Sequence, residues 1–223
     1  MTGIKAAEAA RVHRRAMKLA LFGATGRIGQ PLLRLALQRG HMVTAQARHP
    51  RRLDAFRGPN LTIVPGELDR QTILQTIKGA DAVLVTLAAG SGLLARLDAD
   101  LLPALQSRGP RRVVSMVGAA VAMPGDPETL TLKLMTTVMR LIPNGLLQDA
   151  EAHARRLAAS GLHWTLVRSA NFSDRQPSGR IRAEAAFAMP VSASIACADL
   201  AAFMLELVES DRFVGQSPMV CNG

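Results

Sequence analysis

Short apolar runs alternate with longer helix-like stretches along most of this chain. The run Ala82–Leu87, AVLVTL, is apolar on consecutive residues rather than on alternate ones. A strand of that kind has to be covered on both faces, as strands are in a parallel sheet. Strands separated by helices are joined by right-handed crossovers. The alternation therefore predicts an α/β protein built on a doubly wound, Rossmann-like parallel sheet.

The same pattern places the individual elements. Strands are predicted over Lys18–Phe22, Met42–Ala47, Leu61–Val64, Ala82–Leu87, Arg112–Val117, Trp164–Arg168 and, as a last edge strand, Val214–Cys221. Helices are predicted over Pro31–Arg39, Asp69–Lys78, Leu93–Arg108, Thr129–Leu141, Gln148–Ser160 and Ala198–Glu209. Asp69 is a suitable N-cap for the second of these helices, because its carboxylate can accept from free N–H groups of the first turn.

The length suits one domain. A chain of 223 residues, 48% of them apolar, can bury one core and is short for two. No Gly/Ser-rich linker or fixed-period repeat divides it. We expect one domain over residues 17–223 and an N-terminal extension over residues 1–16. That extension is either a short amphipathic helix or loosely ordered, and Met17 is a second candidate start.

Charge and composition exclude several classes of protein. The 27 Lys and Arg residues exceed the 17 Asp and Glu residues, for a net charge of +10 that favours anionic partners. The basic residues are scattered, however, and aromatic residues are only 3% of the chain, which argues against a nucleic-acid groove built on stacking. No apolar stretch is long enough to span a membrane, and no secretory signal begins the chain. Two cysteines form neither a disulfide framework nor a metal cluster. We expect a cytoplasmic protein with no metal, membrane or nucleic-acid partner.

A glycine motif directly follows the first predicted strand. It reads Gly23, Ala24, Thr25, Gly26, Arg27, Ile28, Gly29, a G-x-x-G-x-x-G pattern that opens the first predicted helix. Gly23 would permit a tight turn, Gly26 would let the backbone approach a pyrophosphate, and Gly29 would let helix and strand pack closely. The free N–H groups and positive dipole end of the helix would attract the phosphates. The motif predicts a dinucleotide site, and the alternative is a tight turn without a ligand.

The end of the second strand distinguishes the two nicotinamide cofactors. An NAD-binding protein usually has an Asp or Glu there that binds the ribose 2′-hydroxyl. This chain has Arg48, followed by His49, Pro50, Arg51 and Arg52. A guanidinium can bind a 2′-phosphate bidentately, and Arg27 could add a second positive charge. We therefore expect NADP(H), with NAD(H) less favoured; an exposed arginine with no ligand is the alternative.

Four segments together resemble the short-chain dehydrogenase/reductase superfamily, over roughly residues 17–210. They are GATGRIG after KLALF, AQARHPRR, GADAVLVTL and SGLHWTLVRSANF. The last of them resembles the atypical branch, which contains biliverdin-IXβ/flavin reductase-like and nitrogen-regulator-like NAD(P)-binding proteins. The resemblance implies a small C-terminal region on the substrate side. It also implies that Leu68 lies near the adenine, that Thr86, Leu87 and Ala88 line the cofactor, and that Ser169, Ala170 and Phe172 lie near the nicotinamide.

The chain also departs from that superfamily. Most of its dehydrogenases use a Tyr-x-x-x-Lys pair, and this chain has no tyrosine. Ser115 lies two residues too early for the usual catalytic serine and is expected inside its strand. Asp149 and His153, four residues apart, share one helix face and are weak candidates for an acid/base pair. A helix salt pair or a helix cap is the alternative for them.

Three functions agree with these residues. The first is an NADPH-dependent oxidoreductase that passes hydride to a planar acceptor such as a flavin, a quinone or a tetrapyrrole, a reaction in which solvent can supply the proton. The second is a non-catalytic NADP(H)-sensing regulator that binds a partner protein. The third is an epimerase, an isomerase or another reductase with unidentified acid/base groups. We favour an enzyme acting on a small-molecule acceptor. The sequence also allows a homodimer.

Overall fold

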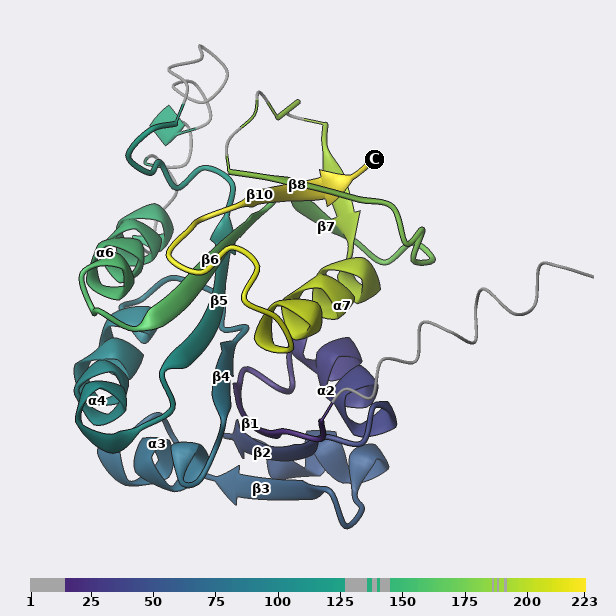
Figure 1. Ribbon diagram of the computed structural model, residues 1–223, viewed down its shortest axis with the longest axis vertical. Helices are drawn as coiled ribbons and strands as arrows, with labels where there is room; N and C mark the ends of the chain where they lie inside the picture. The colour runs from purple at the N-terminus through teal and green to yellow at the C-terminus, as the bar shows by residue number, and fades with distance from the viewer. Residues whose placement is uncertain are drawn as a thin grey trace, which may run out of the picture.

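The chain folds around one large sheet with helices on both faces (Figure 1). The computed structural model describes residues 15–126, 136–137, 140, 145–185, 187, 189–190 and 192–223. The large sheet contains β1 (Lys18–Phe22), β2 (Met42–Ala47), β3 (Leu61–Pro65), β4 (Ala82–Val85), β5 (Arg112–Gly118), β6 (His163–Ser169), β8 (Ile181–Glu184) and β10 (Met219–Asn222). A separate two-stranded sheet pairs β7 (Asn171–Ser173) with β9 (Ser194–Ala196). The helices are α2 (Gly29–Gln38), α3 (Arg70–Ile77), α4 (Leu93–Arg108), α6 (Leu146–Ala158) and α7 (Cys197–Val208), with a 3₁₀ helix η1 (Pro50–Phe56).

The strand order confirms the doubly wound sheet. It runs β3-β2-β1-β4-β5-β6-β10-β8, and every neighbouring pair is parallel except β10 with β8. The chain therefore winds outward from β1 in one direction and then, through β4, in the other. Ligands of such sheets bind beyond the carboxyl ends of the strands where the order reverses, which here is between β1 and β4.

Two hydrophobic clusters, one on each face, explain the continuous apolar runs. Leu19 and Leu21 of β1 belong to the cluster under α2 and α7, whereas Ala20 and Phe22 belong to the cluster under α3, α4 and α6. In Figure 1 the two helical layers lie to the right and to the left of the sheet. Both faces of the strand are thus buried, so neither set of alternate positions can be polar.

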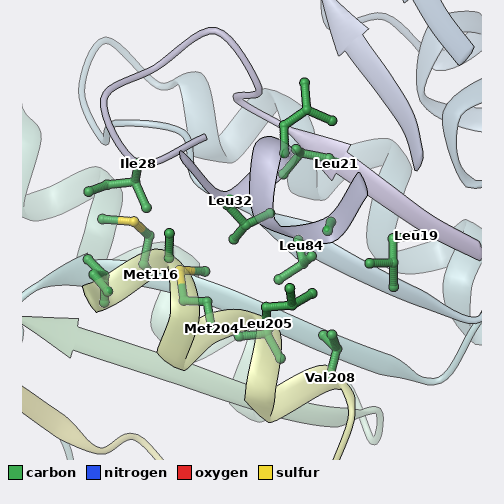
Figure 2. Packing of buried hydrophobic residues seen from close by; sticks show 14 of the residues in the cluster. Leu19, Leu21, Ile28, Leu32, Leu84, Met116, Met204, Leu205 and Val208 are labelled. Atoms are coloured by element: carbon green, nitrogen blue, oxygen red, sulfur yellow. The ribbon is translucent and has the colours of Figure 1, made fainter. Parts of the chain in front are cut away.

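Helix α7 provides much of the first cluster. Figure 2 shows Met204, Leu205 and Val208 of α7 beside Leu32 of α2 and Leu84 of β4. Leu32, Leu84 and Leu205 have no exposed surface. Because each buried leucine contributes about 1.5–3 kcal/mol, this layer holds α2, and the loop before it, firmly against the sheet.

Several predicted boundaries differ from the observed ones. The strand from Ala82 ends at Val85 instead of Leu87, which leaves Thr86 and Leu87 in the following loop. The last strand is not at an edge, because β8 pairs with its outer side. Strands β7, β8 and β9 and helix η1 were not predicted from the pattern. The Asp69 cap is confirmed, since its side chain accepts from the Thr72 N–H at 2.8 Å. The helix predicted over Thr129–Leu141 lies largely outside the described residues.

Candidate cofactor site

The glycine loop between β1 and α2 has no room for side chains at two of its glycines. Gly23 has a φ of +88°, and a Cβ there would lie 2.7 Å from Thr86 Oγ1. A Cβ on Gly29 would lie 2.0 Å from the Gly23 carbonyl oxygen, whereas one on Gly26 would lie 3.2 Å from that oxygen. The tight turn expected at Gly23 and the close packing expected at Gly29 are therefore present. The loop thus has the close packing that a G-x-x-G-x-x-G motif requires, and its binding of a pyrophosphate stays a prediction.

Thr86 joins this loop to the end of β4. Its hydroxyl donates to the Phe22 carbonyl oxygen at 3.1 Å, and its own N–H donates to the same oxygen at 2.9 Å. Thr86 is buried, Leu87 is half-buried and Ala88 is exposed. The sheet therefore brings Thr86 against Gly23, although 63 residues separate them in the sequence. That Thr86 lines the cofactor stays a prediction.

Asp149 clamps the rest of the loop that follows β4. Gly90, Ser91 and Gly92 all have positive φ values, so the backbone enters α4 in a left-handed conformation. The buried Asp149 carboxylate accepts from the N–H groups of Gly90, Leu94 and Ala95 at 3.0–3.1 Å. Because Gly92 has no side chain to cap α4, a residue of α6 supplies the cap. A helix cap was one alternative for Asp149, but its spacing did not indicate that the capped helix would be α4.

Arg48, the residue predicted to favour NADP(H) over NAD(H), lies just after β2. It is exposed, as are Arg51 and Arg52, and among the described residues it forms no hydrogen bond or ion pair. Gln46 donates to the Gly66 carbonyl oxygen at 2.6 Å, which places the loop after β3 beside the end of β2. Leu68 of that loop is half-buried against the second hydrophobic cluster. The unpaired guanidinium of Arg48 and the apolar side chain of Leu68 thus follow the neighbouring strands β2 and β3.

A pocket of about 200 Å³ opens where β5 and β6 end. Its lining contains Ser169, Ala170 and Phe172, the three residues assigned to the nicotinamide end. The complete described lining is Gly118, Ala119, Ala120, Ser169, Ala170, Asn171, Phe172, Met189, Pro190 and Ala193. None of these residues has an ionisable side chain. Phe172 is 37% exposed, so an apolar ring faces solvent beside the pocket.

Arg168, the basic residue of the TLVR segment, connects several chain segments near this pocket. Its side chain is fully buried and forms a bidentate ion pair with Asp126. It also donates to the carbonyl oxygens of Val121, Ala185 and Ser217 at 2.9–3.1 Å. Three separate segments are therefore fixed to the end of β6. Sequence reasoning placed Arg168 in its strand but missed this function.

Asp149 and His153, the weak candidates for an acid/base pair, do not contact each other. The His153 ring instead lies between the Ser115 hydroxyl and the Asp98 carboxylate, each 2.8 Å from a ring nitrogen. Arg156 donates to the same carboxylate at 2.8 Å. Ser115, His153 and Asp98 are all at most 3% exposed. The i, i+4 spacing put both residues on one helix face, but the neighbouring β5 and α4 supply different partners to each.

Arg27 extends from the glycine loop to a distant segment. Its guanidinium forms an ion pair with Asp174 at 3.0 Å, and both side chains are more than half exposed. The Cys197 thiol approaches the other carboxylate oxygen at 3.6 Å. Burial raises the pKa of Cys197 and of Cys221, so neither is an activated thiol. Among the described residues, no cluster of His, Cys, Asp or Glu could hold a metal ion.

Comparison with known proteins shows which family the chain belongs to. The model of the NAD(P)H-binding family matches residues 23–211, most of the chain. The chain belongs to the NAD(P)H-binding family. Its cofactor is thus a nicotinamide dinucleotide, as the glycine loop predicted. The 3-diazoavenalumate denitrifying reductase of a Streptomyces species is 31% identical over 132 residues, 51% of this chain and 42% of that protein's length.

Solved structures share the fold. An oxidoreductase from Lactococcus lactis has a TM-score of 0.74 and 20% identity, covering 93% of this chain and 91% of that one. A short-chain dehydrogenase/reductase from Veillonella parvula, solved in complex with NADP, has a TM-score of 0.75 and 17% identity, covering 92% and 94% of the two chains. The matched family and the shared fold show a Rossmann-like NAD(P)H-binding protein, which is consistent with the resemblance to the short-chain dehydrogenase/reductase superfamily. Within the described part of the chain, no helix is long and apolar enough to cross a membrane.

Proposed function

We propose that the protein is an NADPH-dependent oxidoreductase that passes hydride to a planar, delocalised acceptor such as a flavin, a quinone or a tetrapyrrole. The observation that carries this proposal is the pocket at the ends of β5 and β6, whose described lining has no ionisable side chain. The chain also has no tyrosine to act as the proton donor of ordinary alcohol dehydrogenation. A reaction that needs no acid from the protein fits such a pocket.

The residues of the pocket would bind and orient the acceptor. Bound NADPH supplies the hydride, and the acceptor spreads the incoming charge over its ring system, so that water can deliver the proton. Phe172 offers a ring for stacking at the mouth, and Ala119, Ala170 and Met189 offer apolar contacts. Orientation alone can account for much of the acceleration of such a step. The name of the Streptomyces relative, a reductase, supports this direction of electron flow.

The preference for NADPH rests on Arg48. Its guanidinium is exposed and unpaired among the described residues, at the end of β2 where a 2′-phosphate would lie. Arg51 and Arg52 add positive charge to the same turn. A carboxylate at this position would repel the phosphate, and none is present at positions 47 to 53.

A regulator that senses NADP(H) is the second candidate, because a pocket without an acid or base also suits binding without chemistry. The epimerase alternative is less well supported, since proton abstraction requires a base and the described pocket lining contains none. Turnover therefore separates the two remaining functions.

The test measures the loss of NADPH absorbance with a panel of flavins and quinones. We expect saturable turnover, a raised acceptor KM in Phe172→Ala, and an unchanged NADPH affinity in that variant. His153→Ala serves as the control for general acid catalysis and should keep most activity in its folded fraction, because the ring is buried in the Ser115–Asp98 network. A loss of about a hundredfold there would indicate general acid catalysis instead. Tight NADPH binding without turnover of any acceptor would reject the reductase and support the regulator.

A further inference from the structure

The ion pair between Arg27 and Asp174 connects two parts of the site that are 147 residues apart in the sequence. Arg27 lies inside the glycine loop, between Gly26 and Ile28, where the backbone turns toward the start of α2. Asp174 directly follows β7, the strand that contributes Asn171 and Phe172 to the pocket. A cofactor phosphate held by the glycine loop would therefore meet a guanidinium that already has an anionic partner.

The pair is exposed, and its strength is correspondingly small. The Arg27 and Asp174 side chains are 55% and 80% exposed, and exposed ion pairs contribute little to the stability of a fold. Water and salt screen their attraction, so a competing anion can separate them at small cost. A phosphate offers a guanidinium more acceptor atoms and at least as much charge as one carboxylate.

The Asp174 carboxylate has a second neighbour besides Arg27. One of its oxygens faces Arg27, and the other lies 3.6 Å from the Cys197 thiol at the start of α7. The hydrogen bond and charge of Arg27 lower the pKa of the Asp174 carboxyl, so this group is ionised at neutral pH. A phosphate arriving at the loop thus encounters both an attracting arginine and a repelling aspartate.

We propose that Arg27 exchanges its ion pair with Asp174 for a cofactor phosphate, and that Asp174 is a built-in competitor that weakens cofactor binding. The inference rests on the proposed function only in requiring that NAD(P)H binds the glycine loop, and it does not depend on the acceptor. The exchange releases the segment after β7 from the glycine loop when the cofactor is bound. Cofactor binding is thereby linked to the segment that borders the acceptor pocket.

The test is calorimetric titration of NADPH and NADH into the full chain. Asp174→Asn should tighten binding by about three- to fivefold, because the competitor loses its charge. Arg27→Gln should weaken binding by about tenfold, and Asp174→Asn should have a much smaller effect in the Arg27→Gln background. Both effects should shrink as salt is added. Equal effects on the two cofactors would assign Arg27 to the pyrophosphate, and an effect on NADPH alone would assign it to the 2′-phosphate.

Glu184→Gln is the matched control, because it breaks another exposed ion pair, to Arg182, on β8. It should leave both affinities unchanged. Unchanged or weaker binding in Asp174→Asn and in a second variant, Asp174→Ser, would overturn the proposal, as would the same gain in Glu184→Gln. Failure of the acceptor assay with normal cofactor titrations would reject the reductase alone, and a wild-type chain that binds neither cofactor would overturn both.

Discussion

At the scale of single residues, burial distinguishes the roles of Arg168 and Arg48. The Arg168 guanidinium is fully buried, and all of its described partners are protein oxygens that fix surrounding segments. Arg48 carries the same group on an exposed turn, without a partner among the described residues. A buried arginine with satisfied hydrogen bonds is a structural residue, whereas an exposed, unpaired one at the cofactor edge is available to a ligand.

Exchange of Arg48 tests the cofactor preference. We expect wild type to bind NADPH at least about tenfold tighter than NADH, since a charge-assisted contact contributes about 1.5–3 kcal/mol. Arg48→Asp should reverse this order, because its carboxylate repels a 2′-phosphate and accepts from ribose hydroxyls. Calorimetry at low and high salt measures both affinities. Arg111→Asp is the control, because Arg111 lies before β5, at the amino ends of the strands. Equal wild-type affinities for the two cofactors would show that Arg48 only faces solvent.

Two glycines of the same loop should separate binding from folding. Gly29→Ala places a Cβ 2.0 Å from the Gly23 carbonyl oxygen, so we expect a loss of about 1–3 kcal/mol or more in the free energy of unfolding. Gly26→Val places its Cβ 3.2 Å from that oxygen, a contact that a small shift of the loop relieves, and should mainly reduce NADPH affinity. Urea unfolding and NADPH titration are compared for both variants. Unchanged NADPH binding in folded Gly26→Val would place the pyrophosphate elsewhere.

At the scale of elements, the loops at the carboxyl edge are held by side chains from other elements. The entry into α4 depends on Asp149 of α6, and the Ser115–His153–Asp98 network joins β5, α6 and α4. The ends of β5 and β6 are joined by the Ala119 N–H, which donates to the Ser169 carbonyl oxygen at 2.9 Å. The start of α4 and the ends of β5 and β6 are therefore positioned by hydrogen bonds from other elements as well as by their own turn sequences.

Removal of the Asp149 carboxylate should destabilise the start of α4. Asp149→Ala leaves the N–H groups of Gly90, Leu94 and Ala95 without their acceptor, and we expect a loss of about 2 kcal/mol or more in unfolding free energy. Asp149→Asn keeps an acceptor oxygen and should lose less. Urea unfolding measures both. The exposed Asp54→Ala on η1 is the control, and an effect no larger than in that variant would mean that the cap is dispensable.

At the scale of the whole molecule, the last residues close the fold beside the pocket at the ends of β5 and β6. Asp199 in the first turn of α7 accepts from the N–H groups of Ser178 and Gly179, and from Asn222 of β10 at 2.6 Å. The segment after β7, helix α7 and the carboxyl end of the chain therefore meet at one carboxylate. This junction keeps β8 and β10 beside the pocket that the main sheet creates.

The Asp199 junction should make stability depend on pH in acid. Burial raises the pKa of Asp199, but the hydrogen bonds from Ser178, Asn222 and Gly179 outweigh it, and the net pKa is lowered. A carboxyl whose pKa is lower in the folded state contributes stability above its unfolded pKa, and that contribution disappears as pH falls below about 4. Wild type should thus lose more unfolding free energy than Asp199→Asn between neutral pH and acid. Parallel urea titrations at the two pH values measure this, and identical losses would contradict it.

The features of the fold and of the site that could be predicted from the sequence alone are local or periodic. The apolar runs predicted the sheet because β1 and its neighbours are buried on both faces, and the glycine motif predicted its loop because Gly23 and Gly29 admit no side chain. Asp69 was found as a cap because its partner is three residues away. Arg48 keeps its predicted position at the end of β2, while its ligand stays a prediction.

Contacts between residues far apart in the chain could be seen only in the folded structure. Nothing in the i, i+4 spacing of Asp149 and His153 indicated that one would cap α4 and the other bind Asp98, because those partners lie 54 to 59 residues away. The position of β8 outside β10 and the pairing of Arg27 with Asp174 have the same origin. Short-range patterns depend on the geometry of one strand or helix, whereas these contacts depend on how the finished layers pack against one another.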